Sequence, residues 1–458
     1  MRVILKGKWL IVIAWILAAV LLFFSSPDMA GLLREKGQPS VPDDYTSVRA
    51  GKLLDQMNEQ KGFGDTTDIA LVFHNPAGLT DRDMKEAERA INKLEKENEK
   101  QRGIKQMLSP FEHEELENEL ISEDGKTILV SLVVDRMDRS AEKLSEDLYG
   151  AVSDTNLEHY YTGQELIDED VIRTSEEGLK RTELITVAFI LIVLIAVFRS
   201  VVAPVIPLVT VGISYIVSQS IVAFLVEYVN FPLSNFTQIF LVAVLFGIGT
   251  DYMILLFSRF KEELSIRENV PDAITETYRH AGKTVLYSGI AVLIGFSVIG
   301  LSEFNLYQSA AAVAVGIVVL LAALFTIVPF FMAVLGKNIF WPAKKSLEHR
   351  PSRLWTFAGR MSFARPLLSL IIVAAVTVPF IITYDGGLSY NSLEEIGDDY
   401  KSVKGFEIIE DSFGPGEAMP VTVVLKNDEK MNTTEYMGLM ENISAELEKV
   451  DGVAEVRS

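Results

Sequence analysis

The sequence predicts a multi-span α-helical membrane protein that carries α+β domains outside the membrane. The mean hydropathy is +0.25, and 49% of the 458 residues are hydrophobic. Apolar windows of about 20 residues recur along the chain, which is the length a helix needs to cross a bilayer. Two long hydrophilic stretches, residues 28–183 and 384–458, separate these windows and show both strand-like and helix-like patterns.

Seven apolar segments are candidate membrane spans. They are Trp9–Phe24, Leu184–Phe198, Val201–Val226, Gln238–Phe257, Thr284–Leu301, Ser309–Leu335 and Leu367–Thr383. The first has the basic start of a signal peptide, but no cleavage motif of small residues follows it, which favours an uncleaved anchor.

The spans divide the chain into six predicted regions. These are a cytoplasmic N-terminus with transmembrane helix 1 (1–26), a first extracytoplasmic porter-like domain (27–183), transmembrane helices 2–6 (184–335), a basic cytoplasmic loop (336–366), transmembrane helix 7 (367–383) and an incomplete second extracytoplasmic domain (384–458).

The charge distribution predicts the orientation in the cell membrane. The formal net charge is −20, and residues 28–183 hold 36 acidic against 20 basic residues. Basic residues gather before span 1 and after spans 2, 4 and 6, whereas loops 227–237 and 302–308 have none. The positive-inside rule therefore places the N-terminus in the cytoplasm and both acidic domains outside. Acidic exterior domains argue against nucleic acid as a partner, and the absence of cysteine excludes disulfides.

An internal repeat links the two hydrophilic stretches. The segment DDYTSVRAGKLLDQ from Asp43 matches DDYKSVKGFEIIED from Asp398 at five of its first six residues, with an offset of 355. Each copy follows a span and leads into an alternating, strand-like run, DIALVFHN in one and PVTVVLKN in the other. The first copy continues in the βαββαβ order of a ferredoxin-like sandwich, and the second stops after one βαβ unit. We expect a truncated chain whose C-terminal half is missing; the alternative is a half-transporter that pairs with another chain.

Asp251 is the only acidic residue within the seven spans. An ionised carboxylate at the bilayer centre costs about 2.5 to 3.5 kcal/mol on insertion scales, so such residues usually have a function. In a low-dielectric site a carboxyl group takes up a proton more readily than in water, as a proton relay requires. Tyr252 offers a hydroxyl, and Ser288 begins span 5 at a similar depth. We therefore predict a relay of Asp251, Tyr252 and Ser288.

Small residues near this relay predict close helix packing. Gly247 lies one turn before Asp251, and Gly289 and Gly316 lie on spans 5 and 6. Two structural alternatives stay open. Ser288 and Tyr252 can be packing residues bonded to backbone carbonyls, and Asp251 can make a buried hydrogen bond between helices.

These segments resemble the MmpL family of the resistance-nodulation-division (RND) superfamily. The resemblance lies in GIGTDYMILLFSRFKEEL (247–264), in AGKTVLYSGIAV (281–292) and in the order of one span, exterior domain and five spans. It implies an RND-type transporter architecture and proton-driven export of lipids and other hydrophobic molecules. It also implies an Asp-Tyr pair on the fourth span of each half, which Asp251 and Tyr252 match.

The expected function is a proton-motive-force-driven secondary exporter of lipid-like or amphiphilic molecules across the cell membrane. Membrane lipids, the hydrophobic cargo and the missing half are the expected partners. The sequence has no P-loop, nucleophile elbow or zinc pattern, so we expect no enzyme, metal or cofactor. The alternative is a protein-secretion accessory of SecD/SecF type or a lipid-sensing membrane module. An intramembrane aspartic protease would need a second intramembrane aspartate.

Overall fold

The computed structural model describes most of the chain and divides it into two compact units. The described residues are 1–37, 42, 44–60, 66–98, 103–112, 116–137, 139–234, 236–267, 269–342, 353–384, 393–396, 400–418, 420–426 and 432–457. The helical unit comprises Met1–Pro42 and Ile172–Tyr390, and the αβ unit comprises Asp43–Val171 and Asn391–Ser458.

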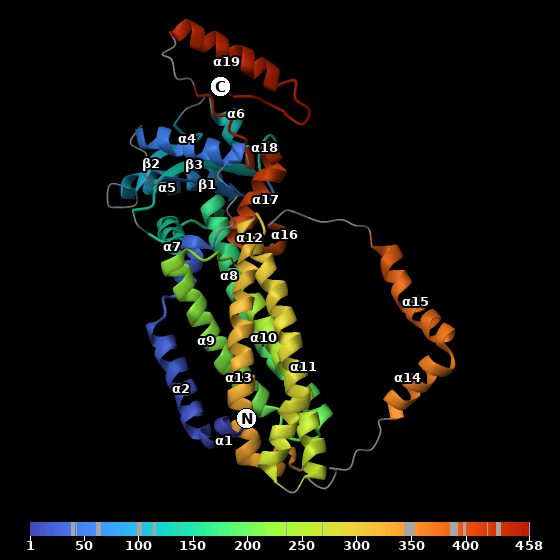
Figure 1. The fold of residues 1–458 in the computed structure, drawn as a ribbon. Helices are drawn as coiled ribbons and strands as arrows, with labels where there is room; N and C mark the ends of the chain where they lie inside the picture. Colours follow the sequence, from blue (N-terminus) through green and yellow to red (C-terminus); the bar gives the residue numbers. More distant parts are fainter. Residues whose placement is uncertain are drawn as a thin grey trace. The chain divides into compact units, whose positions relative to one another are not determined.

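The αβ unit contains a four-stranded antiparallel sheet. Its strands are β1 (Thr66–His74), β2 (Ile104–Leu108), β3 (Thr127–Asp135) and β4 (Glu158–Thr162), in the spatial order β2-β3-β1-β4. Helix α5 (Asp81–Asn98) connects β1 to β2, and α7 (Ala141–Ala151) connects β3 to β4 (Figure 1). This is the ferredoxin-like βαββαβ arrangement, so the predicted fold class is confirmed.

Helices α5 and α7 cover one face of this sheet. Alternate residues of the central strands, such as Leu71 and Phe73 on β1 and Val130 on β3, are fully buried against Ile91 and Leu94 of α5. Successive side chains of a strand point to opposite faces, so Val72 faces the other side and is also fully buried. Both faces of β1 are therefore covered, which explains the continuous apolar run of this strand.

The second face is covered by a helix from far along the chain. Ile409 of α17 (Lys401–Phe413) packs with Val72 and Leu129, and Gly405 lies against Tyr160 of β4. A hydrogen bond of 2.8 Å joins the hydroxyls of Thr127 and Ser412. Where the sequence predicts two exterior domains, 27–183 and 384–458, the structure places residues of both in one compact unit.

The strand predicted in the second copy of the repeat is not formed. Residues 420–426, which hold most of the alternating run PVTVVLKN, have no strand hydrogen bonding. A strand is stable only against a partner, and the described residues supply none for this segment. The remaining helices of the unit are α4 (Thr46–Gln60), α6 (Glu117–Leu120), α16 (Leu393–Ile396), α18 (Pro415–Ala418) and α19 (Thr433–Leu447).

Replacing Gly405 with Ala is expected to weaken the packing of α17 on the sheet, at a cost of about 1 to 3 kcal/mol in the stability of the αβ unit. A Cβ at this position would lie 2.9 Å from the Cβ of Tyr160 and 3.3 Å from that of Thr162, and both atoms are fixed to the strand backbone. Hydrogen exchange of the α17 amides in the purified protein should become faster.

The matched control is Gly51→Ala on α4, where an added Cβ meets nothing within 4 Å. This change should stabilise its helix by about 0.5 to 1 kcal/mol, because Ala has the higher helix propensity. Unchanged exchange in α17 of the Gly405 variant would contradict the packing described here.

The helical unit is built around α13. This helix (Ala312–Leu335) is apolar on all sides and packs against α9 (Val205–Val229), α10 (Phe236–Ile266), α11 (Val270–Ile299) and α2 (Lys8–Ser25) (Figure 1). The other helices of the unit are α1 (Arg2–Lys6), α3 (Met29–Lys36), α12 (Asn305–Gln308), α14 (Arg353–Ala364) and α15 (Pro366–Thr383), with short 3₁₀ turns at Ser309–Ala311 and Gly336–Phe340. Helix α8 (Gln164–Phe198) begins in the αβ unit and belongs to the helical unit from Ile172 on.

Each predicted span corresponds to a helix or part of one. Within the described residues, 6 helices are long and apolar enough to cross a membrane, and Ile185–Phe198 is a shorter apolar segment at the end of α8. Four boundaries differ from the prediction by four residues or more, and one of them is the end of α10, at Ile266 rather than Phe257. Helix α9 begins at Val205 rather than Val201, after Pro204 at its N-cap. Helix α8 begins at Gln164, and α11 begins at Val270, because polar turns extend both helices beyond their apolar windows.

Candidate functional site

Helix α10 has one packed face and one open face. The packed face carries fully buried residues such as Leu241, Leu245 and Met253. The open face follows the same helix at three- and four-residue intervals, and its members are exposed in the described structure: Phe240, Ala243, Gly247, Asp251, Leu255 and Ser258. Three of these residues, Ala243, Gly247 and Ser258, are small, so this face leaves room for a close neighbour.

Asp251 lies on the open face, midway along the 31-residue helix. At 1.5 Å per residue it is about 22 Å from either end of α10 and about 12 Å from Arg259, the next charged residue. Its carboxylate makes no hydrogen bond or ion pair with the described residues. The carboxylate therefore faces away from the bundle core, and the alternative of a buried hydrogen bond to a neighbouring helix of this chain is not seen.

Tyr252 and Ser288 are not linked to Asp251 in the described structure. Tyr252 is half-buried and packs against the core of the helical unit. The Ser288 hydroxyl donates to the carbonyl of Thr284 at 2.8 Å, within its own helix α11. The geometry of Ser288 matches the packing alternative, and its part in a relay stays a prediction, as does that of Tyr252.

The three predicted glycines have different surroundings. A Cβ on Gly289 would lie 2.6 Å from Leu321, so α11 and α13 approach closely there. A Cβ on Gly316 would lie 2.9 Å from Leu241 of α10, so this glycine serves the contact with span 4 rather than span 5. Gly247 meets nothing within 4 Å among the described residues. The close contact between α10 and α9 is instead at Gly249, where an added Cβ would lie 2.6 Å from the Val211 side chain; Gly249 is not among the predicted packing glycines.

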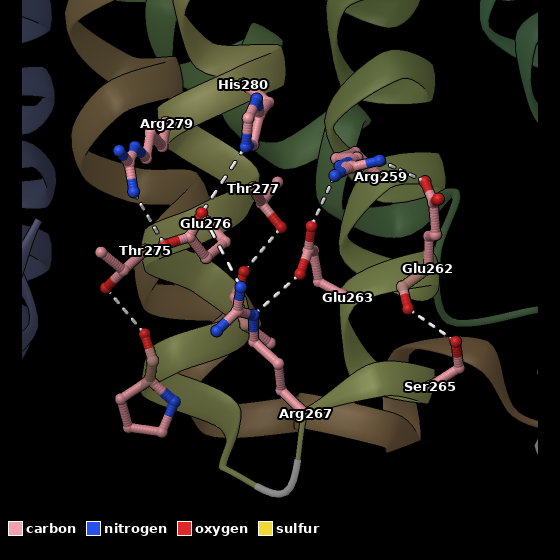
Figure 2. A network of polar contacts seen from close by, with 12 residues as sticks. Arg259, Glu262, Glu263, Ser265, Arg267, Thr275, Glu276, Thr277, Arg279 and His280 are labelled. Atoms are coloured by element: carbon pink, nitrogen blue, oxygen red, sulfur yellow. Dashed lines mark hydrogen bonds and ion pairs between the residues drawn. The ribbon is translucent and has the colours of Figure 1, made fainter.

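Charged residues gather where α10 ends and α11 begins (Figure 2). The Glu263 carboxylate forms one ion pair with Arg259, at 2.7 Å, and another with Arg267, at 2.9 Å. Arg267 also lies 3.8 Å from Glu276 on α11, so it bridges the two helices. The spacing of three and four residues along FSRFKEELSIRENV contains the signal for these pairs.

Glu263 is the buried centre of this cluster. Its side chain is 4% exposed, whereas Glu262 is 43% exposed and, among the described residues, pairs with Arg259 alone, at 2.7 Å. The basic start and amphipathic spacing of SRFKEELSIRENVPDAITETYRHAGKT (258–284) predict one helix at the membrane surface across this region. The structure instead shows two separate helices that extend past their apolar segments, with α10 ending at Ile266 and α11 beginning at Val270. Ion pairs link the charged side chains of these extensions.

Comparison with known proteins identifies the relatives of this chain. The sequence model of the MMPL family matches residues 40–369. The chain belongs to the MMPL family. The open, acidic α10 and the ferredoxin-like sheet both lie within the matched range. Membership agrees with the resemblance found in the sequence and identifies the chain as a membrane protein of this family.

Curated relatives cover the chain almost completely. The putative membrane protein YdgH of Bacillus subtilis (strain 168) is 45% identical over 457 residues, which is 100% of this chain and 50% of that protein. The apo-petrobactin exporter of Bacillus anthracis is 23% identical, with 91% of this chain and 60% of that protein covered. The probable transport protein MmpL12 of Mycobacterium tuberculosis H37Rv is 23% identical, with 98% and 39% covered. The chain spans about half the length of the curated relatives it matches.

A solved structure also resembles the fold. The crystal structure of SecDF, a translocon-associated membrane protein from Thermus thermophilus, matches with a TM-score of 0.41 and 14% identity, covering 82% of this chain and 64% of that chain. This likeness is too weak to bear on function.

Proposed function

We propose that this chain is part of a secondary exporter in which Asp251 binds and releases the proton that drives transport. One observation carries the proposal: a lone carboxylate lies in the middle of an apolar helix, on a face that leaves room for another helix. A carboxyl group that changes between charged and neutral at such a face changes how strongly the face attracts a polar partner. Protonation can thereby shift the packing of α10.

The cargo we propose is a lipid-like or amphiphilic molecule moved across the cell membrane. Two relatives are named as an exporter and as a probable transport protein, and one of these names specifies apo-petrobactin. Membrane lipids and the rest of the polypeptide are the proposed partners. In the proposed cycle, movement of α10 is passed to the αβ unit through α8, which continues from residues next to β4 into the apolar segment. Replacing Asp251 by Asn in the natural protein tests the proposal, since Asn cannot take up or release a proton.

The proposed orientation places the αβ unit outside the cell and the corner between α10 and α11 in the cytoplasm. The chain has no cysteine, so single cysteines can report on it. A membrane-impermeant maleimide should label Glu88→Cys, an exposed position of α5, on intact cells. Lys337→Cys, exposed after α13, should be labelled only after the cells are permeabilised. The reverse pattern would overturn the orientation.

A further inference from the structure

The αβ unit has an open pocket of about 620 Å³ between α5 and the loop that follows α7. One wall of the pocket carries four cationic side chains of α5, namely Arg82, Lys85, Arg89 and Lys93. The other wall is formed by residues 151–156. The pocket lies wholly within this unit, and the proposed proton site does not involve it.

The cations line up because of helix geometry. They recur at intervals of three and four residues, so they share one side of α5 while Ala87, Ile91 and Leu94 bury the opposite side against the sheet. With a rise of 1.5 Å per residue, neighbouring cations are spaced about 4.5 to 6 Å along the axis. The four cations therefore form a row along the wall of the pocket.

Two of the three acidic side chains that line the pocket already make hydrogen bonds or ion pairs within the protein. Glu86 accepts hydrogen bonds from the backbone N–H of Asn156 and from the hydroxyl of Thr155, the latter at 3.2 Å. The pKa of Glu86 is lowered, chiefly by the bond from Asn156, so the carboxylate stays ionised and bound to this loop. Asp154 pairs with Lys93. Asp81, at the start of α5, is the remaining acid of the lining.

Three cations stay without an ion pair in the described structure. Arg82, Lys85 and Arg89 have no carboxylate oxygen within salt-bridge distance among the described residues. Their surroundings make this unusual, because residues 28–183 hold 36 acidic residues that could pair with them. Unpaired guanidinium and ammonium groups that converge on a pocket are the groups that bind phosphate and carboxylate oxygens, Arg in a bidentate manner.

We infer that the pocket binds a multivalent anion, a molecule with two or more phosphate or carboxylate groups, along the row Arg82, Lys85 and Arg89. A single negative charge would satisfy only one member of the row. Helix positions about 4.5 to 6 Å apart along the axis suit an anion whose charges are separated by a few bonds. A free polyanion and a charged lipid headgroup both have this chemistry.

The test measures anion binding to the full chain, purified in an uncharged detergent, by isothermal titration calorimetry. Tripolyphosphate should bind saturably and more weakly as salt is raised, and inorganic phosphate should bind less tightly. The double variant Lys85→Ala/Arg89→Ala should lose about tenfold or more in affinity. The control Lys96→Ala/Lys143→Ala removes two exposed cations that do not line the pocket and should bind as the parent does.

A second pair of titrations separates the two sources of the anion. Micelle-free dihexanoyl phosphatidic acid that binds at the same residues, while dihexanoyl phosphatidylcholine does not, would assign the pocket to a lipid headgroup. Binding of tripolyphosphate alone would assign it to a free polyanion. Absence of saturable binding by every anion, or equal affinity in the parent and the Lys85/Arg89 variant with unchanged thermal stability, would overturn the inference. None of these results depends on transport by Asp251.

Discussion

Replacing Asp251 with Asn is expected to abolish transport while the protein still inserts and accumulates at its normal level. Asn has the size and hydrogen-bonding capacity of Asp, but it cannot titrate, so the energy of the proton gradient is no longer coupled to the helix. The measurement is efflux of a panel of amphiphilic fluorescent dyes from membrane vesicles with an imposed pH gradient, using the protein expressed from its natural gene. Dyes that the parent exports should stay at background in the variant.

Two further measurements separate proton binding from packing. Ser258→Ala, on the same open face of α10, changes no titratable group and should leave efflux unchanged. Dicyclohexylcarbodiimide, which modifies protonated carboxyl groups in apolar surroundings, should label Asp251 at low pH and label it less as the pH rises. Full efflux by the Asn variant, or no labelling of Asp251 at any pH, would rule out the proton role.

Replacing Glu263 with Gln is expected to destabilise the helical unit by about 2 to 3 kcal/mol. The change removes a 4%-exposed carboxylate that holds both Arg259 and Arg267, and it leaves two cations in a partly buried site. The cost stays below that of a fully buried pair because the two arginines are 31% and 39% exposed and water screens them. Thermal unfolding of the detergent-solubilised protein should begin several degrees lower.

Glu262→Gln is the matched control for this change. Glu262 is one residue away and 43% exposed, and Arg259 is its one ion-pair partner in the described part of the chain. Exposed pairs contribute about 0 to 1 kcal/mol, so this variant should unfold close to the parent temperature. Equal shifts in the two variants would show that the buried Glu263 stabilises this unit no more than the exposed Glu262 does.

Local sequence patterns were enough to find the elements of this protein. Runs of about 20 apolar residues mark the spans because a helix in a bilayer has no water to satisfy its polar groups and must be apolar along its length. The alternation in DIALVFHN and the helical spacing between the strands predicted the βαββαβ order of the first copy. Asp251 could be identified from the sequence because it is the one acidic residue within the predicted apolar spans.

Tertiary structure decided which faces of these elements meet. Whether residues 420–426 form a strand depends on a partner strand, which no local pattern reveals. The packing of α17 on the sheet joins residues more than 200 positions apart, such as Val72 and Ile409, and apolar spacing shows only that a face is buried, not against what. In the same way, the sequence identified Asp251 as a carboxylate in a membrane helix. Only the packing of α9, α11 and α13 around α10 decided that this carboxylate lies on the open side, because these helices cover the opposite face, which carries Leu241, Leu245 and Met253.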